Sequence, residues 1–479
     1  MFDELFTSDG WLNQAITVLN DILWTYLLIG ALICCGLWFT WRTRFVQFRM
    51  VGEMLRLLAD AVPSTEKKAE KTKHISSFQA FAVSVATRVG TGNLAGVATA
   101  IAIGGPGAVF WMWVIALIGA ATAFVESTLG QLFKQKHSDS FIGGPAYYIR
   151  RGLHSRWLSV LFAMLITITF GLSYNSIQSN TICSAMHEAF GWHPHVVGLV
   201  LVGLSLLIVF GGIQRIARVS SVVVPLMAVG YLVLAVIVVV LNIEHVPTMF
   251  RLIFSNAFGF EQIAGGGLGA TMMNGIKRGL FSNEAGEGSA PNVAATAHVS
   301  HPVKQGLIQS LGVFTDTLLV CSCTAFIVLL SGLYTTPGLT GIALTQSALQ
   351  SEIGSIGPVF VAVAIFLFAF SSIIGNYYYG EANIRVMSSS RVLVTVYRLL
   401  SGGVVVMFGA MASLDIVWNL GDLCMALLTV CNLIAIIALG KYAFRLLDDY
   451  RRQKRAGIRE PEFHRSQMPE IASDLDCWE

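Results

Sequence analysis

Two glycine-rich interruptions in apolar stretches are the first feature of this sequence that could do chemistry. The first reads Val89-Gly-Thr-Gly-Asn-Leu-Ala-Gly96, and the second contains Gly265-Gly-Gly-Leu-Gly269. Glycine costs a helix about 1 kcal/mol per position relative to alanine, so both stretches favour a break in the helix. N–H groups freed at a helix end attract an anion, and freed carbonyls attract a cation. One break alone is compatible with close packing of small residues, but two at corresponding places in two halves indicate a transporter built from inverted repeats.

Two pairs of neutral polar side chains add candidate ligands. Asn175 and Gln178 are one helical turn apart, so both amides can face one cavity and bind an ammonium or a carboxylate without adding charge. The alternative is a hydrogen bond that only holds two helices together. Ser371 and Ser372 are adjacent hydroxyls in an apolar stretch and offer neutral oxygens of the kind a dehydrated sodium ion needs. Alternatively, both hydroxyls bond to the preceding turn of their own helix.

Ionisable residues within apolar stretches form a third group, namely Arg88, Glu126, Asp316 and Asp422. A charge at membrane depth is costly and by default indicates a function with a nearby partner. We expect Arg88 to be balanced by Glu126 or Asp316, with a purely structural ion pair as the alternative. For the three acids, bracing of helices and gating are equally compatible with the sequence.

The composition shows what kind of elements must hold these residues. The chain has 479 residues, of which 54% are hydrophobic and only 12% charged, with a mean hydropathy of +0.67. Soluble domains carry about 25% charged residues, whereas lipid covers most of the flank of a multi-spanning membrane protein. A cytosolic enzyme and a secreted disulfide scaffold are therefore excluded.

The cysteines give no sign of a disulfide or a metal site. Seven of the eight lie in apolar runs without a CxxC pair or a Cys/His cluster, so we expect small buried side chains. These are Cys34, Cys35, Cys183, Cys321, Cys323, Cys424 and Cys431.

The sequence predicts an all-α membrane protein with eleven transmembrane helices. The first 41 residues contain no Lys or Arg, so the apolar run 16–40 is a retained helix rather than a signal peptide. Ten further stretches have the roughly 20 residues that a crossing requires. These core spans one to ten are 77–103, 107–133, 157–189, 195–212, 219–241, 258–284, 306–334, 358–380, 392–412 and 414–440.

The basic residues predict the orientation. When the boundary segments 277–304 and 385–398 are counted with the loops they adjoin, 29 of the 31 Lys and Arg residues fall on one side, Arg251 falls on the other side and Arg88 lies within a span. By the positive-inside rule the N-terminus is outside and the C-terminus is in the cytoplasm.

The predicted division of the chain has five parts. It starts with an outside N-terminus and accessory helix (1–41) and a basic cytoplasmic loop (42–76), followed by five-helix repeats at 77–245 and 246–440. The cytoplasmic tail 441–479 balances eight basic with eight acidic residues, and we expect it to be solvated and weakly ordered.

The most specific motif follows the first glycine interruption. It reads Gly104-Gly-Pro-Gly-Ala-Val-Phe-Trp-Met-Trp-Val-Ile-Ala-Leu-Ile-Gly119 and resembles the signature of the sodium:alanine symporters, also called the alanine or glycine:cation symporter family. The runs Val89–Val97, Gly143–Ile149 and Arg278–Gly286 are similar to further motifs of that family, and the resemblance extends from about residue 16 to 440. It implies a leucine-transporter-type fold: an accessory helix plus a 5+5 inverted-repeat core with core helices one and six broken.

For the substrate, the resemblance implies a site at the two breaks. Main-chain N–H groups near Thr91 and Gly92 would hold the substrate carboxylate, with Asn93 in the same break. Gly266 and Gly267 in the second interruption would contact the other end of the substrate.

For the cation, the resemblance pairs the hydroxyls of Ser371 and Ser372 with the carbonyls of Ala86 and Val89 as a sodium site. Arg88 stands where the related fold places a carbonyl for another sodium ion. We therefore hypothesise that its guanidinium takes the place of that second cation, which leaves one sodium per substrate.

The expected function is sodium-coupled uptake of a small neutral amino acid, alanine or glycine, by alternating access. The expected partners are that amino acid, the co-transported sodium ion and the lipid bilayer of a bacterial inner membrane, with no nucleic acid. The nearest alternative is a proton-coupled carrier on the same fold. A membrane-embedded enzyme is remote, because His187, His193 and His195 lie at one end of a span without the spacing of a metal site.

Overall fold

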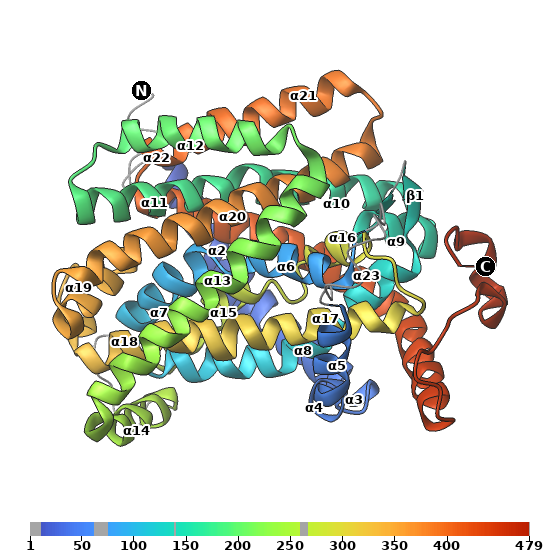
Figure 1. Ribbon diagram of the computed structural model, residues 1–479, viewed down its shortest axis with the longest axis horizontal. Coiled ribbons are helices and arrows are strands. Elements are labelled where there is room, and N and C mark those ends of the chain that lie inside the picture. Colours follow the sequence, from blue (N-terminus) through green and yellow to red (C-terminus); the bar gives the residue numbers. More distant parts are fainter. Residues whose placement is uncertain (1–10, 62–74, 138–139, 259–266, 479) are drawn as a thin grey trace.

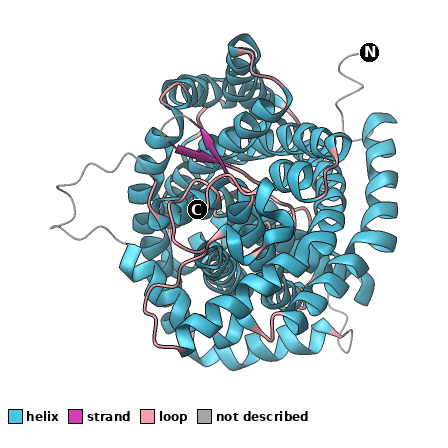
Figure 2. Ribbon diagram, turned by 90° about the vertical axis from the view of Figure 1, so that its right-hand side faces the viewer, coloured by secondary structure: helices cyan, strands magenta, loops and turns pink. Residues whose placement is uncertain are grey.

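The computed structural model describes residues 11–61, 75–137, 140–258 and 267–478, and most of them lie in helices (Figure 1). Long helices run side by side along the horizontal axis of Figure 1, with α14 and α19 at the left end and β1, α9 and the C-terminus at the right end. Figure 2 is viewed from that right end and shows a small antiparallel hairpin near the C-terminus. The described chain is thus all-α apart from this hairpin.

The first half supplies the accessory helix and five core spans, some of which contain a short π-helical turn. The bounds are α2 (Trp11–Ile22), α3 (Ile29–Arg42), α4 (Val46–Arg49), α5 (Val51–Ala61), α6 (Ser77–Arg88), α7 (Val97–Gly104), α8 (Ala108–Leu132), β1 (Gln135–His137), β2 (Ser140–Ile142), α9 (Pro145–Gly152), α10 (Arg156–Ile168), α11 (Asn175–Phe190), α12 (Pro194–Val209) and α13 (Gly212–Leu241). π-Helical turns at Leu23–Leu28, Gly92–Gly96 and Thr169–Tyr174 join neighbouring helices.

The second half repeats this pattern. The bounds are α14 (Val246–Ala257), α15 (Leu268–Asn283), α16 (Ala290–Ala294), α17 (Pro302–Val313), α18 (Ser322–Ser331), α19 (Gly341–Ile353), α20 (Ile356–Met387), α21 (Arg391–Leu399), α22 (Val405–Met411) and α23 (Leu414–Arg455). π-Helical turns fill Phe314–Cys321 and Leu400–Val404.

Most of the expected spans have a matching helix. Eight continuous helices in the described part are long and apolar enough to cross a membrane, and they match the accessory span and core spans two, three, five and seven to ten. Span one is divided into Ser77–Arg88 and Gly92–Gly104, span four is the shorter Pro194–Val209, and span six is described only from residue 267. The total of eleven spans stays a prediction.

Helices that lie five spans apart in the chain pack against each other. α8 packs along α17, α11 along α20, α12 against α22, and α7 against α15. These contacts pair span two with seven, three with eight, four with nine, and one with six. This is the packing expected if two five-helix repeats interlock.

The burial of the cysteines largely follows the prediction. Six of the seven in apolar runs are buried, whereas Cys34 is exposed on α3.

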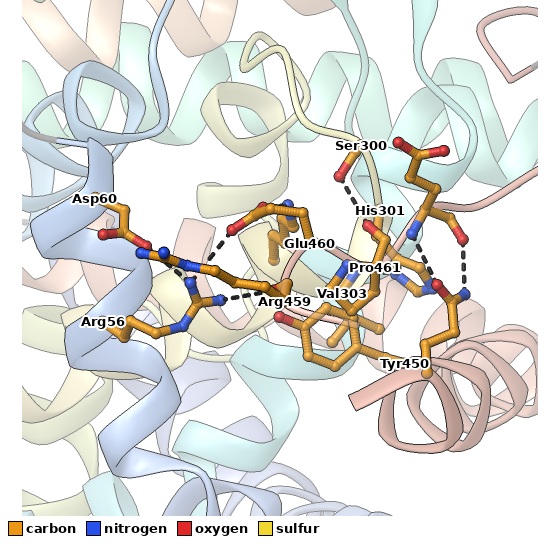
Figure 3. A network of polar contacts seen from close by, with 12 residues as sticks. Arg56, Asp60, Ser300, His301, Val303, Tyr450, Arg459, Glu460 and Pro461 are labelled. Atoms are coloured by element: carbon orange, nitrogen blue, oxygen red, sulfur yellow. Dashed lines mark hydrogen bonds and ion pairs between the residues drawn. The ribbon is translucent and has the colours of Figure 1, made fainter. Parts of the chain in front are cut away.

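The tail differs from the expectation of weak order. α23 continues to Arg455, and the chain then packs onto the end of the bundle that carries α5, β1, β2 and α9, which we call the basic face. Its attachments are hydrogen bonds from Ser300 Oγ to the Pro461 carbonyl (2.8 Å) and from Trp478 Nε1 to the Leu132 carbonyl (2.9 Å). Glu460 forms ion pairs with Arg56 and Lys304 (Figure 3 shows the Arg56 contact).

Apolar side chains explain why this tail is ordered despite its charge. They follow no helical spacing, so the sequence pattern suggested a solvated segment, but they are buried against the bundle, and the rings of Phe463 and Trp478 also pack on each other at 5.5 Å between centroids. They are Phe463, Met468, Ile471, Leu475 and Trp478.

Candidate functional site

The first break lies in span one, where the sequence predicts it. α6 begins with a reciprocal cap, in which Ser76 Oγ accepts from the Gln79 N–H and Gln79 Oε1 accepts from the Ser76 N–H. It ends at Arg88, and the chain resumes a helical course at residue 91. Asn93 Oδ1 accepts the Gly90 N–H at 2.9 Å, so a side chain within the break satisfies one of its exposed donors.

Gly90 is required by close packing. A Cβ at this position would lie 2.5 Å from Ser372 Oγ and 2.9 Å from Gln178 Oε1. The missing side chain therefore lets a hydroxyl of span eight and an amide of span three approach the broken backbone together.

The four predicted sodium-site residues come together at this point. Ser372 Oγ lies 2.9 Å from the Ala86 carbonyl and 3.4 Å from the Val89 carbonyl, while Ser371 Oγ lies 3.5 Å from the Ala86 carbonyl. The alternative contact with the preceding turn of the same helix is present as well, because the Phe368 carbonyl lies 2.8 Å from Ser371 Oγ and 3.0 Å from Ser372 Oγ. One hydroxyl proton can satisfy only one carbonyl at a time, so several oxygen lone pairs converge in a buried place, as a cation requires.

Gln178 faces the break, as the sequence predicts. Its Oε1 accepts from the Thr91 N–H at 3.0 Å and from Thr91 Oγ1 at 2.7 Å. The amide oxygen of Gln178 therefore occupies the Thr91 N–H, which the resemblance assigns to the substrate carboxylate. All of these groups are buried.

Asn175 does not share that cavity. Its Nδ2 donates to Ser401 Oγ in span nine at 3.0 Å, which is the helix-holding alternative. Three residues on a helix advance by about 300°, and span three has neighbours on several sides. Asn175 and Gln178 therefore reach different partners.

Gly267 lies away from the first break, contrary to the prediction, and Gly266 lies outside the described residues. Gly267 is exposed at the start of α15, and nothing lies within 4 Å of the Cβ it lacks. One turn later, Thr271 Oγ1 donates to the Gly104 carbonyl at the end of α7, whereas the other end of α15 meets Gly92. Gly104 and Gly92 are about 18 Å apart along a helix at 1.5 Å per residue, so the start of α15, where Gly267 lies, is far from the first break.

The described part of span six is interrupted between α15 and α16, at residues 284–289, whereas residues 265 and 266 of the glycine-rich run lie outside the described residues. Glu284 has a left-handed backbone (φ 56°), as do Gly286 (φ 98°) and Gly288 (φ 82°), so the chain winds through a tight turn there. The sequence Glu284-Ala-Gly-Glu-Gly-Ser289 is polar, so it suggested the end of a span rather than its middle. A Cβ on Gly92 would lie 2.9 Å from the Phe281 ring, so the two broken helices meet closely just before this turn.

Asp316 ties the two broken helices together from span seven. Its Oδ1 accepts from Asn93 Nδ2 at 2.6 Å, and its Oδ2 accepts from Ser282 Oγ at 2.7 Å and from Thr317 Oγ1 at 2.9 Å. Asn93 is therefore a link between spans one and seven in this structure.

Arg88 contacts neither of its expected partners. Its Nη1 donates to the Gln309 carbonyl at 3.2 Å, and a Cβ on Gly312 would lie 2.4 Å from that atom, so Gly312 makes room for the guanidinium. Glu126 accepts instead from the Gly286 N–H (3.2 Å) and from Asn432 Nδ2 (2.9 Å).

Arg88 interacts with the acids expected to balance it through electrostatics at longer range rather than through direct contact. The Arg88 charge acts over a longer range on the buried carboxyl groups of Glu126, Asp316, Glu284 and Glu287. The turn 284–289 thus places two further acids near this one guanidinium.

Asp422 links α23 to α15 through ion pairs, a contact that either bracing or gating would use. Its Oδ2 lies 2.5 Å from Arg278 Nη2 and 3.0 Å from Lys277 Nζ. Lys277 and Arg278 both lie within α15, although the orientation was predicted with both counted on the cytoplasmic side. The remaining basic residues still give the predicted asymmetry.

Aromatic rings that sequence reasoning missed surround the break. Phe281 lies 4.9 Å from Trp418 and 4.8 Å from Tyr174 between ring centroids. A Cβ on Gly96 would lie 3.6 Å from Trp418. Phe281 stands in the motif Arg278–Gly286 and could have been found there; nothing in the sequence around Trp418 distinguishes it from an ordinary span residue.

Solved structures with a similar fold are transporters. The Eremococcus coleocola manganese transporter matches with a TM-score of 0.53 at 13% identity, covering 81% of this chain and 87% of that chain. MhsT in complex with L-phenylalanine matches with a TM-score of 0.50 at 14% identity, covering 76% of this chain and 98% of that one. The chain therefore has the leucine-transporter-type fold, with a broken first core helix.

The sequence comparisons show which family of transporters this is. Residues 9–465 match the sodium:alanine symporter family, and the chain belongs to it. From Bacillus subtilis (strain 168), a probable sodium/glutamine symporter, GlnT, is 51% identical over 98% of this chain and 96% of its own length. The amino-acid carrier protein AlsT of the same organism is 49% identical over 98% of both chains, and a putative sodium/proton-dependent alanine carrier, YrbD, is 42% identical over 97% of both. The protein is thus a membrane transporter, not an enzyme.

Proposed function

We propose that this protein carries a small neutral amino acid, alanine or glycine, into the cell together with sodium by alternating access. The observation that carries the proposal is the convergence of Ser371, Ser372, Ala86, Val89 and Phe368 on one buried point beside the break in span one. Neutral hydroxyl and carbonyl oxygens suit a hard monovalent cation.

The substrate carboxylate would bind at Thr91. In the resting contact, Gln178 Oε1 accepts from both the N–H and the hydroxyl of Thr91. A carboxylate oxygen can take these two donors in its place, after which the freed amide of Gln178 accepts from the substrate ammonium. The rings of Phe281 and Trp418 beside Gly92 and Gly96 limit the side chain to a small one.

Coupling follows from the shared backbone. A cation held between Val89 and Ser372 stabilises the broken stretch that also presents Thr91, so cation binding favours substrate binding. The protein loaded with both then closes to the outside and opens to the cytoplasm. One charge that crosses 100 mV contributes about 2.3 kcal/mol, or about fiftyfold accumulation. The proposed setting is a bacterial inner membrane with the N-terminus outside and the basic face in the cytoplasm.

Two relatives favour variants of this proposal. GlnT is described as a probable sodium/glutamine symporter, which favours glutamine as substrate, and YrbD as a putative sodium/proton-dependent alanine carrier, which favours a proton as an additional coupling ion. The buried carboxyl groups near Arg88 are the groups that a proton would use.

The test is uptake of labelled L-alanine into proteoliposomes of the purified protein. An inward sodium gradient is compared with choline at clamped pH, and a proton gradient is imposed separately, with glycine and glutamine as competitors. Accumulation driven by sodium alone and inhibited by glycine supports the proposal. Accumulation driven only by protons overturns the coupling ion, and stronger inhibition by glutamine than by glycine overturns the substrate.

A further inference from the structure

A cavity of about 310 Å³ on the basic face brings together cations from three separate elements. Lys136 comes from β1, Arg150 from α9 and Arg385 from the end of α20, with Tyr147 and Ser389 also lining it. This cavity lies among the loops of the basic face and takes no part in the transport site described above.

A hydrogen bond joins two of the elements that line this cavity. Tyr147 Oη donates to the Ala382 carbonyl at 3.2 Å and thereby joins α9 to α20. Arg150 lies one turn after Tyr147 on α9, and Arg385 lies one turn after Ala382 on α20. Residues three apart share a helix face, so this bond sets both guanidinium groups toward the same space.

The charges around the cavity do not cancel. Among the described residues, the one carboxylate partner of Arg385 is Glu381, which also pairs with Arg398. Arg385 Nη2 lies 2.5 Å from Glu381 Oε1, and Arg398 Nη2 lies 3.3 Å from Glu381 Oε2. Lys136 and Arg150 have no carboxylate within ion-pairing distance among the residues that the structure describes. The cavity therefore holds an excess of positive charge, which an anion would balance.

The position of the cavity selects the kind of anion. Ser389 precedes α21 by two residues, and the first turns of α21 expose Val392 (72%) and Val396 (45%), which would contact lipid tails. A phosphate held by the three cations would sit at headgroup depth beside this apolar flank. Basic pockets between helices on the cytoplasmic side are a recurrent mode of anionic lipid recognition.

We infer that Lys136, Arg150 and Arg385 form a binding site for the phosphate of an anionic phospholipid headgroup at the cytoplasmic surface. The site holds the hairpin β1–β2, α9 and the end of span eight in one arrangement when the lipid is bound. It goes beyond the proposed transport function and does not depend on it.

The test is lipid binding to the purified full-length protein, followed by native mass spectrometry in detergent. Phosphatidylglycerol and phosphatidylcholine of equal chain length are added separately, with and without inorganic phosphate. The double variant Lys136→Gln/Arg150→Gln is compared with Arg49→Gln/Arg455→Gln, which removes two exposed basic residues of the same end of the molecule. Arg150→Lys, which keeps the charge, serves as a rescue variant, and unfolding temperatures without lipid confirm that every variant folds.

The expected result is a preference for phosphatidylglycerol that the pocket double variant loses. Each basic side chain near a membrane surface contributes about fivefold to the binding of an anionic lipid, so the two together predict about a thirtyfold loss. The control double variant and Arg150→Lys should retain most of the preference. Equal binding of both lipids, or a preference that survives in the pocket variant, overturns the site; displacement of the lipid by millimolar inorganic phosphate overturns the lipid as its source.

Discussion

Ser372 Oγ lies 2.9 Å from the carbonyl oxygen of Ala86, so a hydroxyl of span eight touches the backbone of span one just before its break. Removal of this hydroxyl in Ser372→Ala should raise the sodium concentration needed for half-maximal alanine uptake by about tenfold, because a lost charge-assisted contact costs about 1.5 kcal/mol or more. Ser371→Ala should have a smaller effect, because Ser371 Oγ is 3.5 Å from the same carbonyl.

The control for this series is Ser176→Ala. Ser176 is a buried serine whose hydroxyl bonds only to the Ser173 carbonyl of its own helix. An equal shift in sodium dependence in Ser176→Ala would show that the loss of any buried serine acts on sodium coupling, and the site would lose its support.

Gly90→Ala should abolish uptake without preventing insertion into the membrane. The added methyl group would lie 2.5 Å from Ser372 Oγ, so it would separate the spans that form both proposed sites. Gly203→Ala in α12 is the matched control, because nothing lies within 4 Å of its Cβ and alanine favours the helix. Uptake by Gly90→Ala at the control's rate would mean that the approach of Ser372 and Gln178 to Gly90 is not needed.

Asn175→Ala and Gln178→Ala should separate in their effects. Loss of the Asn175–Ser401 hydrogen bond should lower stability by about 0.6 kcal/mol, typical of such bonds between membrane helices, and leave the KM for alanine unchanged. Gln178→Ala should raise the KM instead. Measurement of unfolding temperature and uptake kinetics on both variants checks this, and a raised KM in Asn175→Ala would restore that residue to the substrate site.

The attachment of the tail should depend on pH. Burial opposes the ionisation of Glu460, but the hydrogen bonds and charges of Lys304 and Arg56 outweigh it and lower the pKa of Glu460 below its ordinary value. A carboxyl group with a lowered folded-state pKa contributes its full stabilisation above its ordinary pKa and loses it as pH falls through the lowered value. The tail should therefore stay attached at neutral pH and loosen only below about pH 4.

Hydrogen–deuterium exchange of peptides from 456–478, corrected for intrinsic rates, measures this attachment. Glu460→Gln should raise exchange in the tail already at pH 7. Glu462→Gln, two residues away with a weak contact to His464 at 3.9 Å, should not. Equal exchange in the two variants would contradict a specific role for Glu460.

The sequence predicted the structure correctly where a residue type has a single structural role. Apolar length located most of the spans, and the resemblance brought Ser371 and Ser372 onto Ala86 and Val89, where the structure has them. Prediction from the sequence failed where the position of a side chain depends on which helix packs beside it. Spacing along a helix does not say that Asn175 meets span nine, and the glycine content of 265–269 does not reveal the additional polar turn at 284–289.

The tail and Arg88 show a second limit. Both were interpreted from charge, but the tail is ordered by apolar side chains such as Phe463 and Trp478, which contact each other and are buried on a surface that only the folded bundle provides. Arg88 finds a main-chain carbonyl rather than an acid, because Gly312 opens the space beside Gln309. Neither arrangement has a signal in the local sequence.

The most direct test of sodium coupling is the entry of radioactive sodium into proteoliposomes, with and without external L-alanine. The account predicts that alanine stimulates sodium entry at a fixed ratio of one sodium per alanine, and that Ser372→Ala needs about tenfold more sodium to reach the same stimulation. Alanine entry with no accompanying sodium entry would contradict the central claim, and a ratio of two or more would contradict the idea that Arg88 replaces a second cation.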